Sequence, residues 1–479
     1  MNKKISDGVG DFFSAYLWLK ESESGDYYTE NLAFLERVGI PSHRRIHVSK
    51  MTPTVIVLLN EGELSQVKKD ALFSDWSEYE FDEPTVKGDD ILLTQIGADS
   101  INGTNSPLFN SGQGYTGKGV KVGVIAAENL IFNSDALSLE GVDITVLPSF
   151  LPPKVNTHPT AVLSQIVGRK IEVDGTTYFG ASRNAEAFFA PAKTTKNVFE
   201  AIERMAELGV RVINYSAGII KGEYSDFDRQ IDRLIRNGDF LFVTVSGNSR
   251  SMSSPGRAEN GIAVGNLATK NYPDTPLSSP WSVWCQSEDS CSGYNENGVH
   301  KPDLVAPGAW VGYGDGDGNI NFANFGTSFA CPWVSGIACA ILEACQGRYT
   351  YLTVKALILM SCDTESVSTE GNPAISEFIR LRSGYGLLDG RRAVEILQRA
   401  SIYEGILKGE FNAEAEGQDL EIMLVFEKSE DSPVLTVDGE EYETNGQNTL
   451  KIRKRSTKSA SPLSVTGSGG RFSLVVYAN

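Results

Sequence analysis

The chain has little histidine, an excess of negative charge and no long apolar run. Only four of its 479 residues are histidines, so few positions can supply an imidazole base. No run of about 18 apolar residues occurs, so we expect no membrane-spanning helix. Acidic residues outnumber basic ones by 61 to 43, and the net charge of −18 argues against a nucleic-acid partner because a polyanion would be repelled.

The N-terminus also lacks a convincing secretion signal. Lys3 and Lys4 are followed by Asp7 and Asp11, which interrupt the apolar core that a signal peptide requires. We therefore expect a cytoplasmic protein, with secretion as the alternative. Hydrophobic residues make up 41% of the chain, which indicates an ordinary folded protein, and the length of 479 residues predicts two or three domains.

Fingerprints of metal and cofactor sites are missing as well. The six cysteines are not spaced as a zinc site, and without an export signal we expect Cys285 and Cys291 to be reduced rather than bridged. The segment Asp315–Asn319 resembles the first half of an EF-hand, but the twelfth position of that loop is Gly326 instead of glutamate. We expect a glycine-rich hairpin there instead of a metal site. Calcium is the one cofactor that we retain as a candidate, and the sequence identifies no residues that would bind it.

The most informative segment that is present is Phe325–Gly336, which reads G-T-S-x-A-x-P-x-V-x-G from its second residue. Gly326 permits a sharp turn, and Ser328 follows at the start of a predicted helix, where the helix dipole favours negative charge. Pro332 fits because N–H groups in the first helical turn have no intrahelical partner. The plainer alternative is a helix start with a capping serine.

This segment resembles the nucleophile segment of subtilisin-like serine proteases, the subtilases, and four further segments resemble that family in its chain order. His158 opens a stretch similar to H-G-T-x-V-A-x-x-I-x-G, with Pro159 in place of the usual glycine. The other three segments are Val212–Gly218, Val243–Asn248 and Asp303–Gly308. The resemblance implies that His158 is the base, Ser328 the nucleophile and Asn248 a donor to the oxyanion.

The same resemblance implies a cleft that binds an extended peptide. The substrate-binding residues implied are Ser216, Ala217, Gly218, Ser246, Gly247 and Ser253. Ser253–Gly256 is similar to the segment that forms the floor of the family's primary specificity pocket. Its small residues predict a roomy pocket that favours a large apolar side chain before the scissile bond.

One catalytic residue of the family is missing. The first catalytic strand should end in an aspartate, and here Gly117–Ile125 is followed by Ala126. No aspartate occurs between Gly112 and Phe132, so the alignment cannot slip. The aspartate of such a triad orients the imidazole and stabilises the imidazolium, and its removal costs about 3 × 10⁴ in turnover in subtilisin. The sequence therefore predicts an impaired or inactive protease.

Three interpretations of Ala126 stay open. Glu128 could supply the carboxylate, because side chains at i and i+2 face the same side of a strand, and Asp135 is a weaker candidate. Alternatively, the protein is a pseudoprotease or sensor that retains His158 and Ser328 but uses the cleft to bind peptide. In the third interpretation the natural residue is aspartate and this chain is an inactivated variant, so that the activity is ordinary proteolysis.

The pattern of elements predicts three parts. Residues 1–90 hold a strand over Thr52–Asn60 and a helix over Glu61–Ala71, and they resemble an α+β propeptide that would occupy the cleft as the chain's own partner. Residues 91–400 predict an α/β domain with a parallel sheet flanked by helices, as in subtilisin. Residues 401–479 predict a small β domain, for which we expect a sandwich. We expect a serine endopeptidase acting on protein or peptide substrates, with no nucleic-acid or membrane partner.

Overall fold

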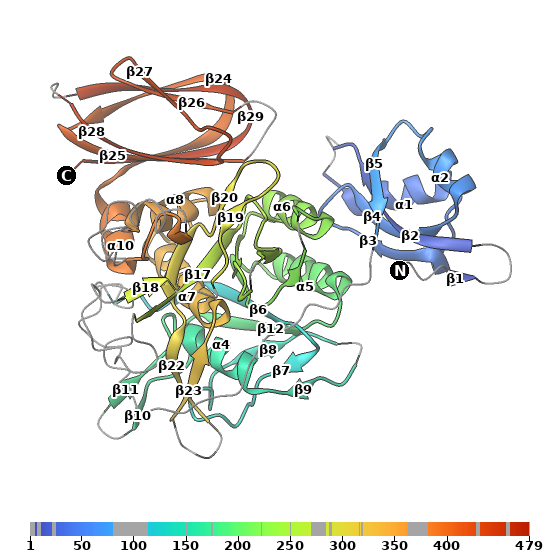
Figure 1. Ribbon diagram of the computed structural model, residues 1–479, viewed down its shortest axis with the longest axis horizontal. Coiled ribbons are helices and arrows are strands. Elements are labelled where there is room, and N and C mark those ends of the chain that lie inside the picture. The colour runs from blue at the N-terminus through green and yellow to red at the C-terminus, as the bar shows by residue number, and fades with distance from the viewer. Residues whose placement is uncertain are drawn as a thin grey trace.

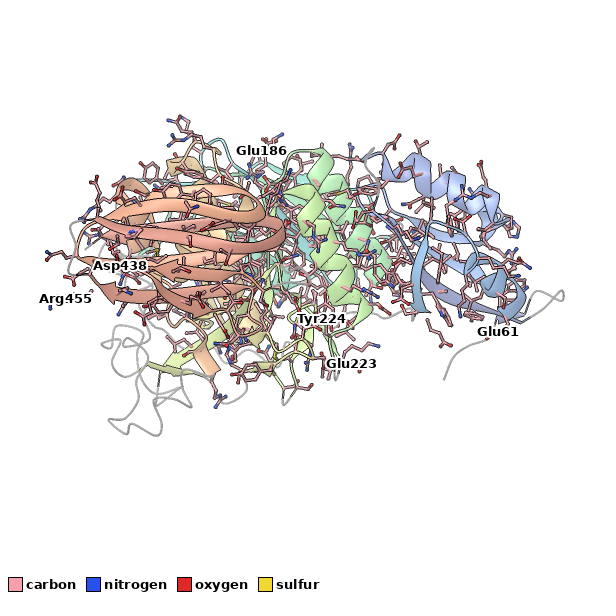
Figure 2. All side chains as sticks on the ribbon, turned by 90° about the horizontal axis from the view of Figure 1, so that it is seen from above. Glu61, Glu186, Glu223, Tyr224, Asp438 and Arg455 are labelled. Atoms are coloured by element: carbon pink, nitrogen blue, oxygen red, sulfur yellow. The ribbon has the colours of Figure 1, made fainter. Side chains whose placement is uncertain are left out.

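A computed structural model describes residues 5–6, 11–21, 25–79, 114–149, 151–173, 176–221, 223–249, 251–269, 284–286, 290–315, 317, 320–362, 382–427, 432–456 and 460–478. An N-terminal α+β module, a central α/β domain and a C-terminal β domain follow one another along the chain (Figure 1). The first and last of these lie on different sides of the central domain (Figure 2). The predicted cleavage point near residue 90 and the predicted start of the mature chain, Leu92–Ala98, lie outside the described residues.

The N-terminal module is a five-stranded antiparallel sheet with helices. Its elements are β1 (Ile5–Ser6), β2 (Asp11–Leu19), α1 (Tyr27–Arg37), the 3-10 turn η1 (Ser42–Arg44), β3 (Arg45–Val48), β4 (Thr54–Leu59), α2 (Glu61–Val67) and β5 (Phe73–Glu78). The strand order is β1-β2-β4-β3, and β5 pairs with β2. Asn60 accepts from the backbone N–H of Glu63, whose carboxylate accepts from the N–H of Asn60, and this capping box starts α2.

The central domain is built on an eight-stranded sheet in which seven strands are parallel. The parallel strands, in spatial order, are β8 (Ile144–Val146), β12 (Glu186–Pro191), β6 (Lys121–Ala126), β13 (Val212–Tyr215), β15 (Leu241–Val245), β17 (Ile262–Thr269) and β21 (Leu304–Pro307). The antiparallel strand β18 (Trp284–Gln286) also pairs with β17. The strands β6, β13 and β15 are almost wholly buried, as expected for a parallel sheet covered on both faces.

The helices that cover this sheet are α4 (Thr157–Val167), α5 (Thr195–Glu207), α6 (Asp226–Gly238), α7 (Thr327–Ala344), α8 (Tyr351–Ser361) and α10 (Gly390–Arg399). Short strand pairs decorate its edges, namely β7 (Leu130–Ile131) with β9 (Lys154–Val155), β10 (Ile171–Val173) with β11 (Thr176–Tyr178), β14 (Ile219–Ile220) with β16 (Ser253–Ser254), β19 (Gly293–Tyr294) with β20 (His300–Lys301), and β22 (Ala309–Gly314) with β23 (Ile320–Phe325). This is the expected α/β arrangement.

Two of these helices mark opposite faces of the sheet. Gly123 on β6 faces α5, because a Cβ added there would come within 2.4 Å of Met205 Sδ. Asn214 on the adjacent strand β13 faces the other way, where its Oδ1 accepts from Ser335 of α7 at 2.9 Å. Side chains alternate along a strand, so Ala126, three residues after Gly123, faces the same side as α7.

The core helix of the domain is α7. By length and composition it is the one helix of the described part that could cross a membrane, with a mean hydropathy of 1.3. In the folded protein, however, 83% of the helix is buried against the sheet and the neighbouring helices. Its apolar character is therefore that of a core element.

The C-terminal domain is a single antiparallel sheet that curls toward a barrel, so the expected sandwich is wrong. Its strands are β24 (Ser401–Glu416), β25 (Asp419–Phe426), β26 (Val434–Val437), β27 (Glu440–Glu443), β28 (Thr449–Arg455) and β29 (Ala460–Ala478). The order is β27-β26-β29-β25-β28, and β24 pairs with β29 over most of their lengths. A register shift between Ile406 and Lys408, opposite the glycines around Gly467, lets both long strands bend without ending. One sheet can therefore enclose its own core.

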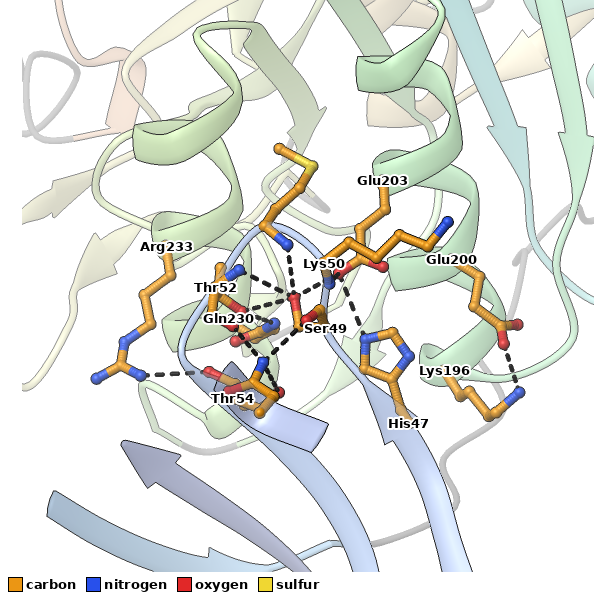
Figure 3. A network of polar contacts seen from close by, with 12 residues as sticks. His47, Ser49, Lys50, Thr52, Thr54, Lys196, Glu200, Glu203, Gln230 and Arg233 are labelled. Carbon is orange, nitrogen blue, oxygen red and sulfur yellow. Dashed lines mark hydrogen bonds and ion pairs between the residues drawn. The ribbon is translucent and has the colours of Figure 1, made fainter. Parts of the chain in front are cut away.

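The N-terminal module packs against α5 and α6 (Figure 3). Ser49 donates to the buried carboxylate of Glu203 on α5, and Gln230 of α6 donates to Thr52 at 3.0 Å. Trp18 is fully buried, with the guanidinium groups of Arg229 and Arg233 over its ring at 4.7 and 4.5 Å. The apolar core of the central domain therefore extends into the module.

Candidate active site

Ser328 is the second residue of α7, directly after a sharp turn. Gly326 occupies the N-cap position with φ of 149°, a conformation that side chains rarely adopt. A Cβ at this position would also come within 3.0 Å of Asn248 Nδ2. The turn therefore requires glycine, and it places the Ser328 hydroxyl near the positive end of the longest helix of the central domain.

The side-chain amide of Asn248 is held in one orientation. Its Oδ1 accepts from both the backbone N–H and the hydroxyl of Thr327, each at 2.8 Å. Because a backbone N–H can only donate, the atom that it contacts must be the amide oxygen, and Nδ2 is left as the outward donor. The role of Thr327 in orienting Asn248 was not predicted from the sequence, although Thr327 directly precedes the serine.

His158 lies in the first turn of α4. Its backbone N–H donates to the N-cap side chain of Asn156 at 2.8 Å, which fixes the start of the helix. The imidazole ring packs against Phe329, the residue after Ser328, with ring centroids 5.4 Å apart. The two catalytic candidates are thus brought to adjacent positions, although no hydrogen bond joins His158 to Ser328 within the described part of the chain.

Within the described residues, no hydrogen bond or ion pair joins the imidazole of His158 to an acidic side chain. Its Nε2 atom is shielded from solvent and makes no hydrogen bond with any described residue. Burial lowers the pKa of His158 to about 4, and no charged group of the described residues opposes that effect. The site therefore holds a neutral imidazole that is reluctant to take up a proton.

Glu128 does not continue the strand that ends at Ala126. β6 ends at Ala126, and both Glu128 and Asn129 then adopt φ of 56°, so the chain turns instead of continuing as a strand. The i, i+2 geometry therefore fails, and Glu128 is exposed at the turn. Asp135 is exposed in the following loop. Ala126 itself is 7% exposed, on the sheet face that carries α7.

A small cavity of about 40 Å³ adjoins Ser328. Its lining residues are Ala217, Gly218, Ile220, Val245, Gly247, Asn248, Ser249, Ser253, Thr327 and Ser328. Four of the expected substrate-binding residues thus lie together with the nucleophile and oxyanion candidates. Ser216 and Ser246 do not line the cavity, since both are buried at the ends of β13 and β15. The sequence did not single out Ile220, although it follows the Ser216–Gly218 segment closely.

The cavity is narrower than the roomy pocket that we expected. Ser253 stands directly beside Gly218, where an added Cβ would come within 2.7 Å of the serine Cβ. Ser253 Oγ also lies 3.1 Å from the equivalent position on Gly247. The small residues pack against one another, and only a small space remains.

Two other expectations concern metals and thiols. The segment expected as a glycine-rich hairpin does connect the antiparallel strands β22 and β23, although Gly316, Gly318 and Asn319 lie outside the described residues. The described residues contain no group of three or more acidic, histidine or cysteine side chains placed to hold a metal ion. Cys291 is buried and its Sγ donates to the backbone carbonyl of Ser251 at 3.2 Å, whereas the side chain of Cys285 is not described, so the reduced state of this pair stays a prediction.

Comparison with known proteins agrees with this geometry. Residues 148–381 match the Subtilase family (Peptidase_S8), a range that includes His158, Asn248 and Ser328 and begins after Ala126. Fervidolysin from Fervidobacterium pennivorans, a keratinolytic enzyme related to subtilisin, is 15% identical with a TM-score of 0.53. The similarity covers 96% of this chain and 69% of the fervidolysin chain.

Two maturation proteases are also similar over part of the chain. The prenylagaramide maturation protease PagA is 23% identical with a TM-score of 0.45, over 58% of this chain and 93% of its own. The patellamide maturation protease PatA is 22% identical with a TM-score of 0.45, and the similarity covers 59% of this chain and 97% of PatA. The observed topology and the likeness to fervidolysin show a subtilisin-like α/β fold, and the candidate site lies in a segment that matches the subtilases.

Proposed function

We propose that this protein is a serine endopeptidase of subtilisin type whose turnover is reduced by the alanine at position 126. The observation that supports the proposal is that Ser328 and the oriented amide of Asn248 line one small cavity, while the His158 ring packs against Phe329, the residue next to Ser328. Each of the three groups has a distinct chemical role in peptide hydrolysis.

In the proposed reaction, Ser328 Oγ attacks the carbonyl carbon of an extended peptide. His158 Nε2 accepts the hydroxyl proton and later gives it to the leaving amine, and water then hydrolyses the acyl-enzyme by the same route. Nε2 suits this role because no described residue forms a hydrogen bond with it. The developing oxyanion would accept hydrogen bonds from Asn248 Nδ2 and from the backbone N–H of Ser328 at the start of α7.

The proton transfer is the weak step. An imidazole with a pKa of about 4 binds a proton poorly near neutral pH, and no carboxylate stabilises the imidazolium that must form. Electrostatic stabilisation of the oxyanion is unaffected by this deficit, because the donors belong to Asn248 and Ser328. We therefore expect slow hydrolysis rather than none.

A peptide-binding pseudoprotease or sensor is the second candidate function. It is favoured by the same absence of a carboxylate at His158, since a binding cleft does not need a competent base. The extended substrate or ligand would add as a strand beside Ser216–Gly218 in either case. In both candidate functions the substrate or ligand is a protein or a peptide. We also propose that the protein is cytoplasmic.

The test compares the full-length chain with Ser328→Ala and His158→Ala on a mixture of unstructured peptides, with products identified by mass spectrometry. Cleavage that is slow in the native chain and absent from both variants supports the enzyme. Equal cleavage in all three preparations would mean a contaminating protease. Saturable peptide binding with no cleavage dependent on Ser328 would favour the pseudoprotease.

A further inference from the structure

The size of the cavity beside Ser328 limits what it can hold. The cavity measures about 40 Å³ and is partly open to solvent. Ligand pockets for larger groups are on the order of 300–1,000 Å³. A methyl or hydroxymethyl side chain therefore matches this space better than a leucine or phenylalanine side chain does.

Ser253 sets both the depth and the polarity of this cavity. It is 6% exposed, and its Oγ is shielded from solvent without a hydrogen-bond partner among the described residues. The neighbouring Ser254 is different, because its hydroxyl donates to the buried carboxylate of Asp228 and does not line the cavity. Ser253 Oγ lies 2.7 and 3.1 Å from the points where side chains on Gly218 and Gly247 would begin.

An unpaired buried hydroxyl favours a ligand that can pair with it. A buried donor or acceptor without a partner destabilises the protein, and a polar group that enters the cavity would remove that cost. A serine hydroxyl can both donate and accept, so a second hydroxyl is a suitable partner. A larger apolar side chain would have to displace Ser253 and would leave its hydroxyl unpaired.

We infer that Ser253 makes the residue before the scissile bond small, with serine preferred over alanine and both preferred over leucine or phenylalanine. The inference rests on the proposed function, because it takes this cavity as the pocket for that residue. It identifies the substrate class as peptides whose cleavage point follows a small, preferably hydroxylated side chain. The apolar rim formed by Ile220, which is 54% exposed, remains available to adjacent parts of the peptide.

The test measures equilibrium binding, so it does not depend on turnover. Four acetylated peptides of one sequence, ending in serine, alanine, leucine or phenylalanine, are titrated against the full-length chain and followed by calorimetry. Such product-like peptides occupy the pocket without being cleaved. We expect the leucine and phenylalanine peptides to bind at least about 10-fold more weakly than the serine peptide, the scale of discrimination by one pocket contact.

Two substitutions separate size from polarity. Ser253→Gly should deepen the pocket and strengthen binding of the leucine and phenylalanine peptides by about 10-fold or more. Ser253→Ala should keep the large peptides weak but abolish the preference for serine over alanine. Ser251→Ala is the matched control, because Ser251 lies in the same loop and does not line the cavity, so its profile should equal that of the native chain.

The outcomes distinguish this inference from the function on which it rests. Tighter binding of the leucine or phenylalanine peptide by the native chain overturns the inference and leaves the peptide cleft intact. An unchanged profile in Ser253→Gly also overturns it. No detectable binding of any of the four peptides contradicts both the inference and the proposed cleft.

Discussion

The substitution Ala126→Asp tests whether the site lacks only a carboxylate. Ala126 ends β6 on the sheet face that carries α7, which is the face from which Ser328 emerges. An aspartate side chain there would project toward the helices that bear the catalytic candidates. We expect it to accept a hydrogen bond from the His158 ring and to fix the ring with Nε2 toward Ser328.

The size of the gain follows from the environment of His158. Burial lowers its pKa from 6.5 to about 4, and a shift of that size corresponds to about 3 kcal/mol against the imidazolium. A carboxylate that cancels this penalty would raise the rate on the order of 10²-fold. Orientation of the ring adds to that, up to the factor of about 3 × 10⁴ seen when an aspartate is removed from subtilisin. We expect a gain in kcat between about 10² and 10⁴.

The assay is the hydrolysis of a fluorogenic peptide by the native chain, Ala126→Asp and Ala126→Asn. The asparagine variant is the matched control, because it has the same shape but no charge and imposes the wrong tautomer on the ring. It should recover little of the gain. A well-folded Ala126→Asp that is no faster than the native chain would refute the account of why the site is weak.

Three further predictions concern pH, the N-terminal module and processing. Because the base must be unprotonated and the pKa of His158 is lowered to about 4, kcat/KM of the native chain should fall only as pH approaches 4, and the acid limb should move upward in Ala126→Asp. Trp18→Ala should lower the free energy of unfolding by about 3–5 kcal/mol in urea titrations, because Trp18 is fully buried. Trp76 is half-buried, so Trp76→Ala should lower that free energy by less, and equal losses would contradict the packing described. The native protein should run as one 52.0 kDa chain, whereas Ala126→Asp should yield two fragments separated near residue 90, and Ser328→Ala in that background should abolish the cut. If the unmodified chain is cleaved there and Ser328→Ala stops the cleavage, the proposed loss of protease activity is wrong.

Much of the central domain could be predicted because its signals are local. Gly326 and Ser328 lie in one segment whose turn and helix start depend on neighbouring residues, and the buried strands are continuous apolar runs. The alternation of strands with helices then implies a parallel sheet. The same reasoning found His158 at a helix start.

The features that sequence could not supply depend on contacts between distant segments. The pocket looked roomy because its residues are small, but the space is filled by Ser253 packing against Gly218, which a list of residue sizes does not reveal. The orientation of Asn248 comes from Thr327, which lies 79 positions away. Glu128 looked usable only as long as β6 was assumed to continue past Ala126.

The C-terminal domain shows the same limit. Its strands were recognisable as apolar runs, yet the bulge near Ile406 and the glycines around Gly467 allow β24 and β29 to bend and continue. The strands therefore form one curved sheet in place of the two sheets of the expected sandwich. β25 also alternates between two cores, with Leu424 facing the barrel interior and Val425 facing the central domain.

The most direct test of the central claim is covalent labelling of the native chain with a fluorophosphonate, read out by intact mass and by mapping the labelled peptide. A nucleophilic serine beside a base reacts with such a probe, while an ordinary helix-capping serine does not. We predict slow labelling confined to Ser328, faster labelling in Ala126→Asp, and none in Ser328→Ala. Labelling spread over other serines, or an Ser328 that stays unmodified in both the native chain and Ala126→Asp, would contradict the claim that this site is built for nucleophilic catalysis.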